Sequence, residues 1–177
     1  MVMSPHGERN ADSLEFLVEN SRLIVVGQIR KNRGWLNKPG DLITTDYEVA
    51  IERTLKGSVK PGDRITMSVL GGRVGFPGGS WAQVDTPGMT PPFNNQNFVL
   101  FLEPSHFDPS PEERAASHGP IYMPAFMSLG MYLIDGGVVN PKARPSHPLA
   151  KAYGGKSETV LENDVLDIVE KAGRRDK

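Results

Sequence analysis

The clearest hydrophobic pattern in the chain lies at residues 43–55, where apolar and polar side chains alternate. One row of this alternation consists of Ile43, Thr45, Tyr47, Val49, Ile51 and Leu55. A period of two places successive side chains on opposite faces of a strand, so the segment predicts a long β-strand with this row buried. The opposite row, which includes Asp46, Glu48 and Glu52, is expected to face water. A strand this long usually bends across two sheets or coils around a small barrel.

Shorter apolar runs predict the remaining strands. They occupy residues 23–30, 64–69, 81–84, 98–102, 131–134 and 138–139. The run at 98–102 is apolar throughout, which predicts a central strand covered on both faces. Asp135, Gly136 and Gly137 separate the last two runs and predict a hairpin turn. The chain therefore reads as mainly β.

Two helices are predicted, one near each end of the chain. Leu14, Leu17 and Val18 form a helical stripe behind a cap at Asp12 or Ser13. Near the other end, Ser157 caps an amphipathic helix that Gly173 ends. We expect a single domain over residues 1–177, with a flexible arm at 1–11, a helix plus β-barrel core at 13–140, a linker at 141–156 and a C-terminal helix at 157–173.

Long segments rich in Gly and Pro interrupt the strand pattern. Residues 31–42 and 104–120 are predicted to be loops, and 71–96 is predicted to be a loop in which only 81–84 is strand-like. Loops this long in a compact domain are often functional. Four aromatic side chains in or beside them are the candidate binding residues: Trp35, Phe76, Trp81 and Phe93. The alternative is that they fold back and plug the ends of a barrel.

Composition excludes several kinds of chemistry. The 177 residues contain no cysteine, which removes disulfides, thiolate metal sites and cysteine nucleophiles. The 20 basic and 21 acidic residues give a net charge of -1 and no sign of a nucleic-acid-binding surface. No apolar run approaches the ~20 residues of a transmembrane helix, and no signal peptide is visible in residues 1–12.

No catalytic or metal motif emerges from the remaining residues. The segment 150–157 resembles a relaxed phosphate-binding loop, but no buried strand precedes it. His106, His118 and His147 each follow a serine, yet neither a nucleophile elbow nor a zinc-binding helix spacing is present. We therefore predict no catalytic residue, no metal site and no cofactor. A pair of carboxylates could still come together in space.

Five segments carry a resemblance to a known group of proteins. They are residues 23–27, 44–49, 55–57, 61–72 and 98–102. In this order they resemble poorly characterised bacterial domains with an OB-fold-like barrel, similar in shape to netrin modules and to tissue inhibitors of metalloproteinases. The resemblance covers about residues 13–140 and implies a closed barrel of five or six strands, usually extracytoplasmic, with no established activity. Those inhibitors act through an N-terminal cysteine, which this chain lacks, so their mechanism does not carry over.

Three functions follow as hypotheses, in decreasing order of support. The first is a non-catalytic binding or interaction module that holds an unknown protein or small ligand through the Gly/Pro loops. The second is an uncharacterised hydrolase whose site is built from loop acids and histidines. The third is an OB-type nucleic-acid binder, which is disfavoured because the acidic row of residues 43–55 would repel phosphate.

Overall fold

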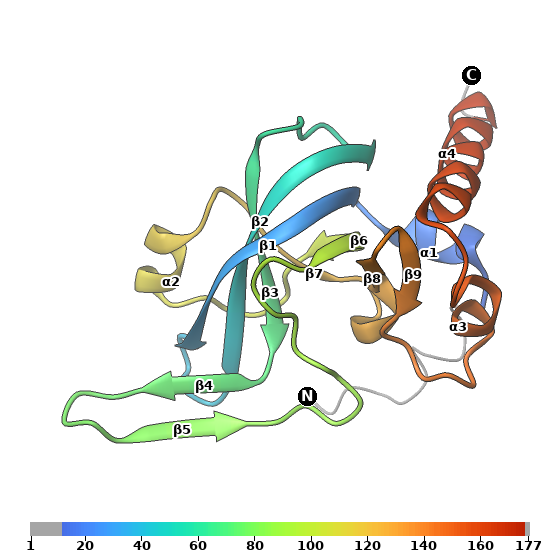
Figure 1. Cartoon of the computed structure of the whole chain (residues 1–177). Coiled ribbons are helices and arrows are strands. Elements are labelled where there is room, and N and C mark those ends of the chain that lie inside the picture. Colours follow the sequence, from blue (N-terminus) through green and yellow to red (C-terminus); the bar gives the residue numbers. More distant parts are fainter. Residues whose placement is uncertain (1–11, 176–177) are drawn as a thin grey trace.

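The computed structural model describes residues 12–175, so the predicted arm at 1–11 lies outside the described residues. The fold is mainly β, with a short N-terminal helix and a longer C-terminal helix (Figure 1). The helices are α1 (Leu14–Asn20), α2 (Pro111–Ala116), the 3-10 turn η2 (Met127–Gly130), α3 (Pro148–Tyr153) and α4 (Glu158–Arg175). The strands are β1 (Leu23–Leu36), β2 (Ile43–Lys56), β3 (Arg64–Leu70), β4 (Gly72–Gly75), β5 (Trp81–Val84), β6 (Asn97–Pro104), β7 (Ile121–Pro124), β8 (Met131–Asp135) and β9 (Val138–Pro141).

Five strands form a ring in the order β1–β2–β3–β7–β6, and β6 pairs again with β1. Neighbouring strands are antiparallel except β3 and β7, which are parallel. The parallel seam contains two residue pairs, Thr66 with Ile121 and Met67 with Tyr122. The predicted mainly β architecture, with a ring of five strands, a short N-terminal helix and a C-terminal helix, is therefore confirmed, although the ring closes along a short and irregular seam. The predicted β8–β9 hairpin extends the sheet beyond β6.

The long alternating strand is confirmed as β2. Its Tyr47, Val49 and Ile51 are at most 3% exposed and pack with apolar side chains of β3 and β6 inside the ring. The ring interior is therefore filled by side chains, as expected of a small barrel.

β1 is longer than predicted, because it continues through residues 31–36, which were expected to belong to a loop. This segment has no alternating apolar row of its own. It pairs with residues 43–48 of β2 in an unbroken register that ends at Leu36 opposite Ile43. Pairing with a long partner strand thus determined a structure that the local sequence did not show.

The apolar side chains of β1 and β6 serve two cores, one on each face of the sheet. Val25 and Leu100 belong to the core inside the ring, whereas Ile24 and Phe101 belong to a second core under the helices. This alternation confirms that the 98–102 strand is covered on both faces. Figure 1 shows α1, α3 and α4 gathered beside β8 and β9, where the second core lies.

The remaining loop segments contain further elements that were not predicted. Residues 141–156, expected to be a linker, contain α3, whose Leu149 and Tyr153 are buried in the second core. Within 71–96, the predicted strand β5 pairs as an antiparallel hairpin with β4, which was not predicted. Within 104–120, α2 begins with a capping box. The turn-rich composition of these segments hid short elements whose stability comes from tertiary packing and capping.

Candidate functional site

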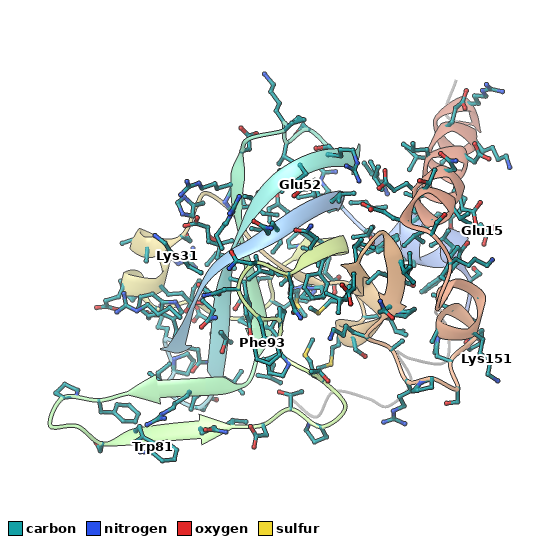
Figure 2. All side chains as sticks on the ribbon, in the orientation of Figure 1. Glu15, Lys31, Glu52, Trp81, Phe93 and Lys151 are labelled. Carbon is teal, nitrogen blue, oxygen red and sulfur yellow. The ribbon has the colours of Figure 1, made fainter. Side chains whose placement is uncertain are left out.

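Two of the four predicted aromatic residues lie on one projecting element. β4, the turn at residues 76–80 and β5 form a hairpin that extends away from the ring (Figure 1), and we call it the aromatic hairpin. Trp81 is 55% exposed and Phe76 is 37% exposed. Figure 2 shows Trp81 on this projecting arm. The hairpin therefore presents two large apolar side chains to solvent.

A cation–π contact organises one face of the aromatic hairpin. The Arg73 guanidinium lies 4.2 Å from the centroid of the Trp81 ring. Strand pairing places Gly75 opposite Trp81 and Arg73 opposite Gln83, so Arg73 and Trp81 share one face as diagonal neighbours. Trp and Arg are among the residues that carry most of the binding energy at protein interfaces.

The base of the aromatic hairpin is fixed to the ring by close backbone contact. A Cβ atom placed on Gly34 of β1 would lie 1.8 Å from the carbonyl oxygen of Arg73, so only glycine permits this approach. The Thr45 hydroxyl donates a hydrogen bond of 2.7 Å to the carbonyl oxygen of Gly71. The hairpin thus projects from a defined position rather than from a free loop.

The other two predicted aromatic residues do not join this surface. Trp35 lies near the end of β1, is 8% exposed, and has the Arg33 guanidinium 4.1 Å from its ring centroid, so of the two alternatives it is the one that folds back against the protein. Phe93 is 63% exposed, but it lies on the segment before β6, apart from Trp81 in Figure 2. The predicted set of four therefore separates into a hairpin pair, a buried tryptophan and an isolated phenylalanine.

A second candidate site, which sequence reasoning missed, lies on the outer face of the ring beside α2. It is a groove of about 230 Å³, and we call it the α2 groove. Its polar and aromatic lining comprises Arg33 and Trp35 of β1, Asp46 and Glu48 of β2, Thr66 of β3 and His118 after α2. Lys31, which also lines it, is seen beside α2 in Figure 2.

Two carboxyl groups are buried together under α2, and one of them, Asp46, lines the α2 groove. Asp46 is 8% exposed and Glu113 of α2 is 1% exposed. Burial raises the pKa of Asp46 to about 7, the neighbouring Glu113 carboxyl adds to the rise, and the nearby Ser68 hydroxyl offsets part of it. Burial also raises the pKa of Glu113. Near neutral pH Asp46 is therefore protonated to a larger extent than an ordinary aspartate.

The expectation that Asp46 faces water is wrong because α2 covers it. Ser110 and Glu113 form a capping box, in which the Ser110 side chain accepts from the Glu113 N–H at 3.1 Å and the Glu113 carboxylate accepts from the Ser110 N–H at 3.2 Å. This cap directs the Glu113 side chain toward the sheet. The Ser-x-x-Glu spacing could have predicted α2, but nothing local showed which strand it would cover.

The rim of the α2 groove carries a hydrogen-bonded charge network. His118 Nε2 lies 3.0 Å from one Glu48 oxygen, and Arg64 donates to the other at 3.0 Å. The backbone N–H of His118 donates a hydrogen bond of 2.7 Å to the Thr66 hydroxyl, and this bond fixes the loop after α2 against β3. Both Glu48 oxygens are therefore satisfied.

Asp46 differs from Glu48 because one of its oxygens is not satisfied. Asp46 Oδ1 is buried and has no hydrogen-bond partner among the described residues. Buried polar atoms normally have a partner, so this acceptor is unusual, as are the buried Thr44 and Ser68 hydroxyl groups, which also have no partner among the described residues.

Residues 12–175 contain no cluster of three or more His, Asp or Glu side chains arranged to hold a metal ion. In the same range, no helix combines the length and hydrophobicity required to cross a membrane.

Comparison with known proteins gives no relative from which a function could be transferred. The chain matches no protein-family model and no curated protein sequence. The function must therefore be inferred from the two sites themselves.

Proposed function

We propose that this chain is a binding module that holds a protein partner through the aromatic hairpin. The observation that carries the proposal is the exposure of Trp81, 55%, on a strand that projects from the ring with Arg73 stacked on its indole. An isolated two-stranded hairpin is marginally stable in water. Exposing its largest apolar side chain is a cost that a partner would remove.

The free edge of the aromatic hairpin supports the same proposal. Within the described residues, β5 pairs only with β4, so its outer edge presents unpaired backbone donors and acceptors. Such an edge can accept a strand from another protein, with main-chain hydrogen bonds supplying affinity and neighbouring side chains supplying specificity. Trp81 would then act as the side-chain anchor.

The test compares capture of partners from native extract by the unmodified protein and by Trp81→Ala. We expect the variant to lose the partner that the unmodified protein retains, because truncating an aromatic anchor costs ~2 kcal/mol or more. Phe93→Ala is the matched control, since Phe93 is equally exposed but lies apart from the hairpin. Equal capture by Trp81→Ala and the unmodified protein would refute the proposal.

An extracytoplasmic setting is a further part of this proposal. It rests on the resemblance to OB-fold-like bacterial domains, to netrin modules and to tissue inhibitors of metalloproteinases. Fractionation of cells that express the full native protein tests this location. We expect the protein outside the cytoplasmic fraction, and its recovery in the cytoplasmic fraction would contradict the proposal.

A second candidate function, a hydrolase, is favoured by the α2 groove. A carboxyl group with a pKa of about 7 suits general acid–base catalysis at neutral pH, and His118 is oriented by Glu48 at 3.0 Å beside it. Turnover of a panel of ester, glycoside and phosphate substrates that Asp46→Asn abolishes and His106→Gln retains would support this function. His106 is exposed outside the groove, so equal loss in both variants would reject it.

A further inference from the structure

The outer edge of β5 carries free main-chain groups at alternate residues. The Phe76 N–H donates to the Ser80 carbonyl oxygen at 2.8 Å, and these two residues continue the register in which Gly75 lies opposite Trp81. Hydrogen-bonded pairs alternate with non-bonded pairs along an antiparallel ladder. The N–H and C=O groups of Trp81 and Gln83 therefore point away from β4, at the spacing that a further strand requires.

This edge lies on the side of the aromatic hairpin opposite the ring. β4 lies against β1 and β2, and Figure 1 shows β5 beyond it, along the outside of the hairpin. Within residues 12–175, β5 pairs with β4 alone. A strand from another molecule can therefore reach β5 from the solvent side.

Two opposite charges lie on the Trp81 face of the hairpin without an ion pair. The Arg73 guanidinium stacks on the Trp81 indole at 4.2 Å. Asp85 follows β5 directly, and its Oδ1 accepts a hydrogen bond of 3.0 Å from the Gln83 side chain, which leaves Oδ2 for a second donor. Neither Arg73 nor Asp85 takes part in an ion pair within the described part of the chain.

We propose that two copies of this chain pair through β5 as a two-fold antiparallel dimer. Gln83 lies on the two-fold axis, and Arg73 of each copy pairs with Asp85 of the other. This inference rests on the proposed function, because it names a second copy as the partner of the aromatic hairpin. Antiparallel pairing of a strand with its own copy is self-complementary, as a two-fold interface must be.

Charge complementarity selects the register centred on Gln83. This register pairs the outward main-chain groups of Gln83 in the two copies and places Trp81 opposite Asp85 of the second copy. The Asp85 carboxylate then lies beside the guanidinium that stacks on Trp81. A register shifted by one pair, with Trp81 opposite Gln83, moves Asp85 past the partner strand and opposite its turn, so Arg73 stays unpaired.

The opposite face of the hairpin is complementary in the same register. Ala82 of one copy lies opposite Val84 of the other, and Val84 is 44% exposed in the single chain. Cross-strand apolar pairs and opposite charges directly across a sheet both stabilise strand pairing. The dimer therefore matches apolar groups on one face and charges on the other.

The short edge predicts a weak dimer. β5 has four residues, and small interfaces are typical of transient complexes. We expect a Kd of roughly 10–100 µM. Sedimentation equilibrium of the full chain between about 10 µM and about 1 mM measures this Kd. A chain that remains monomeric throughout this range would overturn the proposal.

Charge reversal tests the assigned ion pair. Arg73→Asp and Asp85→Arg should each raise the Kd at least about tenfold, because each brings like charges together. The double variant should recover the Kd of the unmodified protein to within about threefold, which a merely structural loss would not do. Glu52→Arg, on an exposed position of β2, should leave the Kd unchanged. Weakening in both single variants without recovery in the double variant would contradict the pairing.

The absence of cysteine from the chain permits a direct test of the two-fold axis. Directly opposite residues in a hydrogen-bonded antiparallel pair have Cα atoms ~5.5 Å apart, which suits a disulfide. Gln83→Cys should therefore cross-link to its own copy under mild oxidation, whereas Phe93→Cys, exposed but apart from the hairpin, should not. Equal cross-linking of the two variants would exclude the proposed axis.

The dimer and the proposed function can fail separately. If the chain is monomeric while Trp81→Ala loses a different protein from native extract, the dimer is refuted and the aromatic hairpin still binds a partner. If Gln83→Cys cross-links and the charge-reversed double variant recovers the dimer, the second copy is the partner of the hairpin.

Discussion

Removing the charge of Asp46 should stabilise the protein at alkaline pH and do so less at acidic pH. The pKa of Asp46 is raised to about 7 in the folded protein, against 3.8 for an ordinary aspartate. Between these values the folded state binds more protons than the unfolded state, so the free energy of unfolding falls as the pH rises through this window. Asp46→Asn removes this penalty because it cannot ionise.

The magnitude follows from the pKa values. A tenfold change in an ionisation constant is worth about 1.4 kcal/mol, so the full window corresponds to about 4 kcal/mol of destabilisation at pH 8. The part between pH 5 and the folded-state value corresponds to about 3 kcal/mol. Because Glu113 lies against Asp46 and shares the proton, we expect the advantage of the variant to grow by about 2 kcal/mol from pH 5 to pH 8.

Urea unfolding at pH 5, 6, 7 and 8 measures this difference. Glu52→Gln is the matched control, because Glu52 is exposed on the same strand. Glu113 still titrates in the variant, so the change with pH reports the ionisation of Asp46 together with its coupling to Glu113. Parallel stability curves for Asp46→Asn and the unmodified protein would refute the burial of an ionisable carboxyl group under α2.

Three further substitutions test how the elements are held together. Gly34→Ala should cost ~1–3 kcal/mol of unfolding free energy and alter the fluorescence of the two tryptophans, because its Cβ would overlap the Arg73 carbonyl. Gly75→Ala, with open space around it, should lower the unfolding free energy by less. Leu161→Ala should cost ~2–5 kcal/mol in urea unfolding, since this side chain of α4 is fully buried in the second core. Arg53→Ala, which breaks two ion pairs of 2.6 Å to α4, should cost at most ~1 kcal/mol, and less in high salt.

The parts of the fold that follow from local pattern could be predicted from the sequence. The alternation at 43–55 specified both the strand β2 and the face it buries. With a side-chain period of two, only one of the two faces carries the apolar row. The stripe of Leu14, Leu17 and Val18 likewise specified α1 and its buried face. The apolar run at 98–102 indicated a central strand, and β6 pairs with β1, β7 and β8.

The missed elements depend on partners distant in the chain. Residues 31–36 became strand because β2 continues beside them. Asp46 became buried because Glu113, far along the sequence, caps a helix above it. Trp35 is buried because it lies on the same segment of β1. A local pattern cannot report such pairings, so the sequence identified the aromatic hairpin only in part and did not identify the α2 groove.

The two candidate sites meet at the end of β1. Along this strand Gly34 contacts the base of the aromatic hairpin, while its neighbours Arg33 and Trp35 line the α2 groove. Alternate positions along one strand thus divide between the two sites. A substitution at Arg33, Gly34 or Trp35 therefore alters the strand that supports both candidate sites. Trp81 and Asp46 each contribute to one site only, so these two residues are where a hairpin function and a groove function can be tested separately.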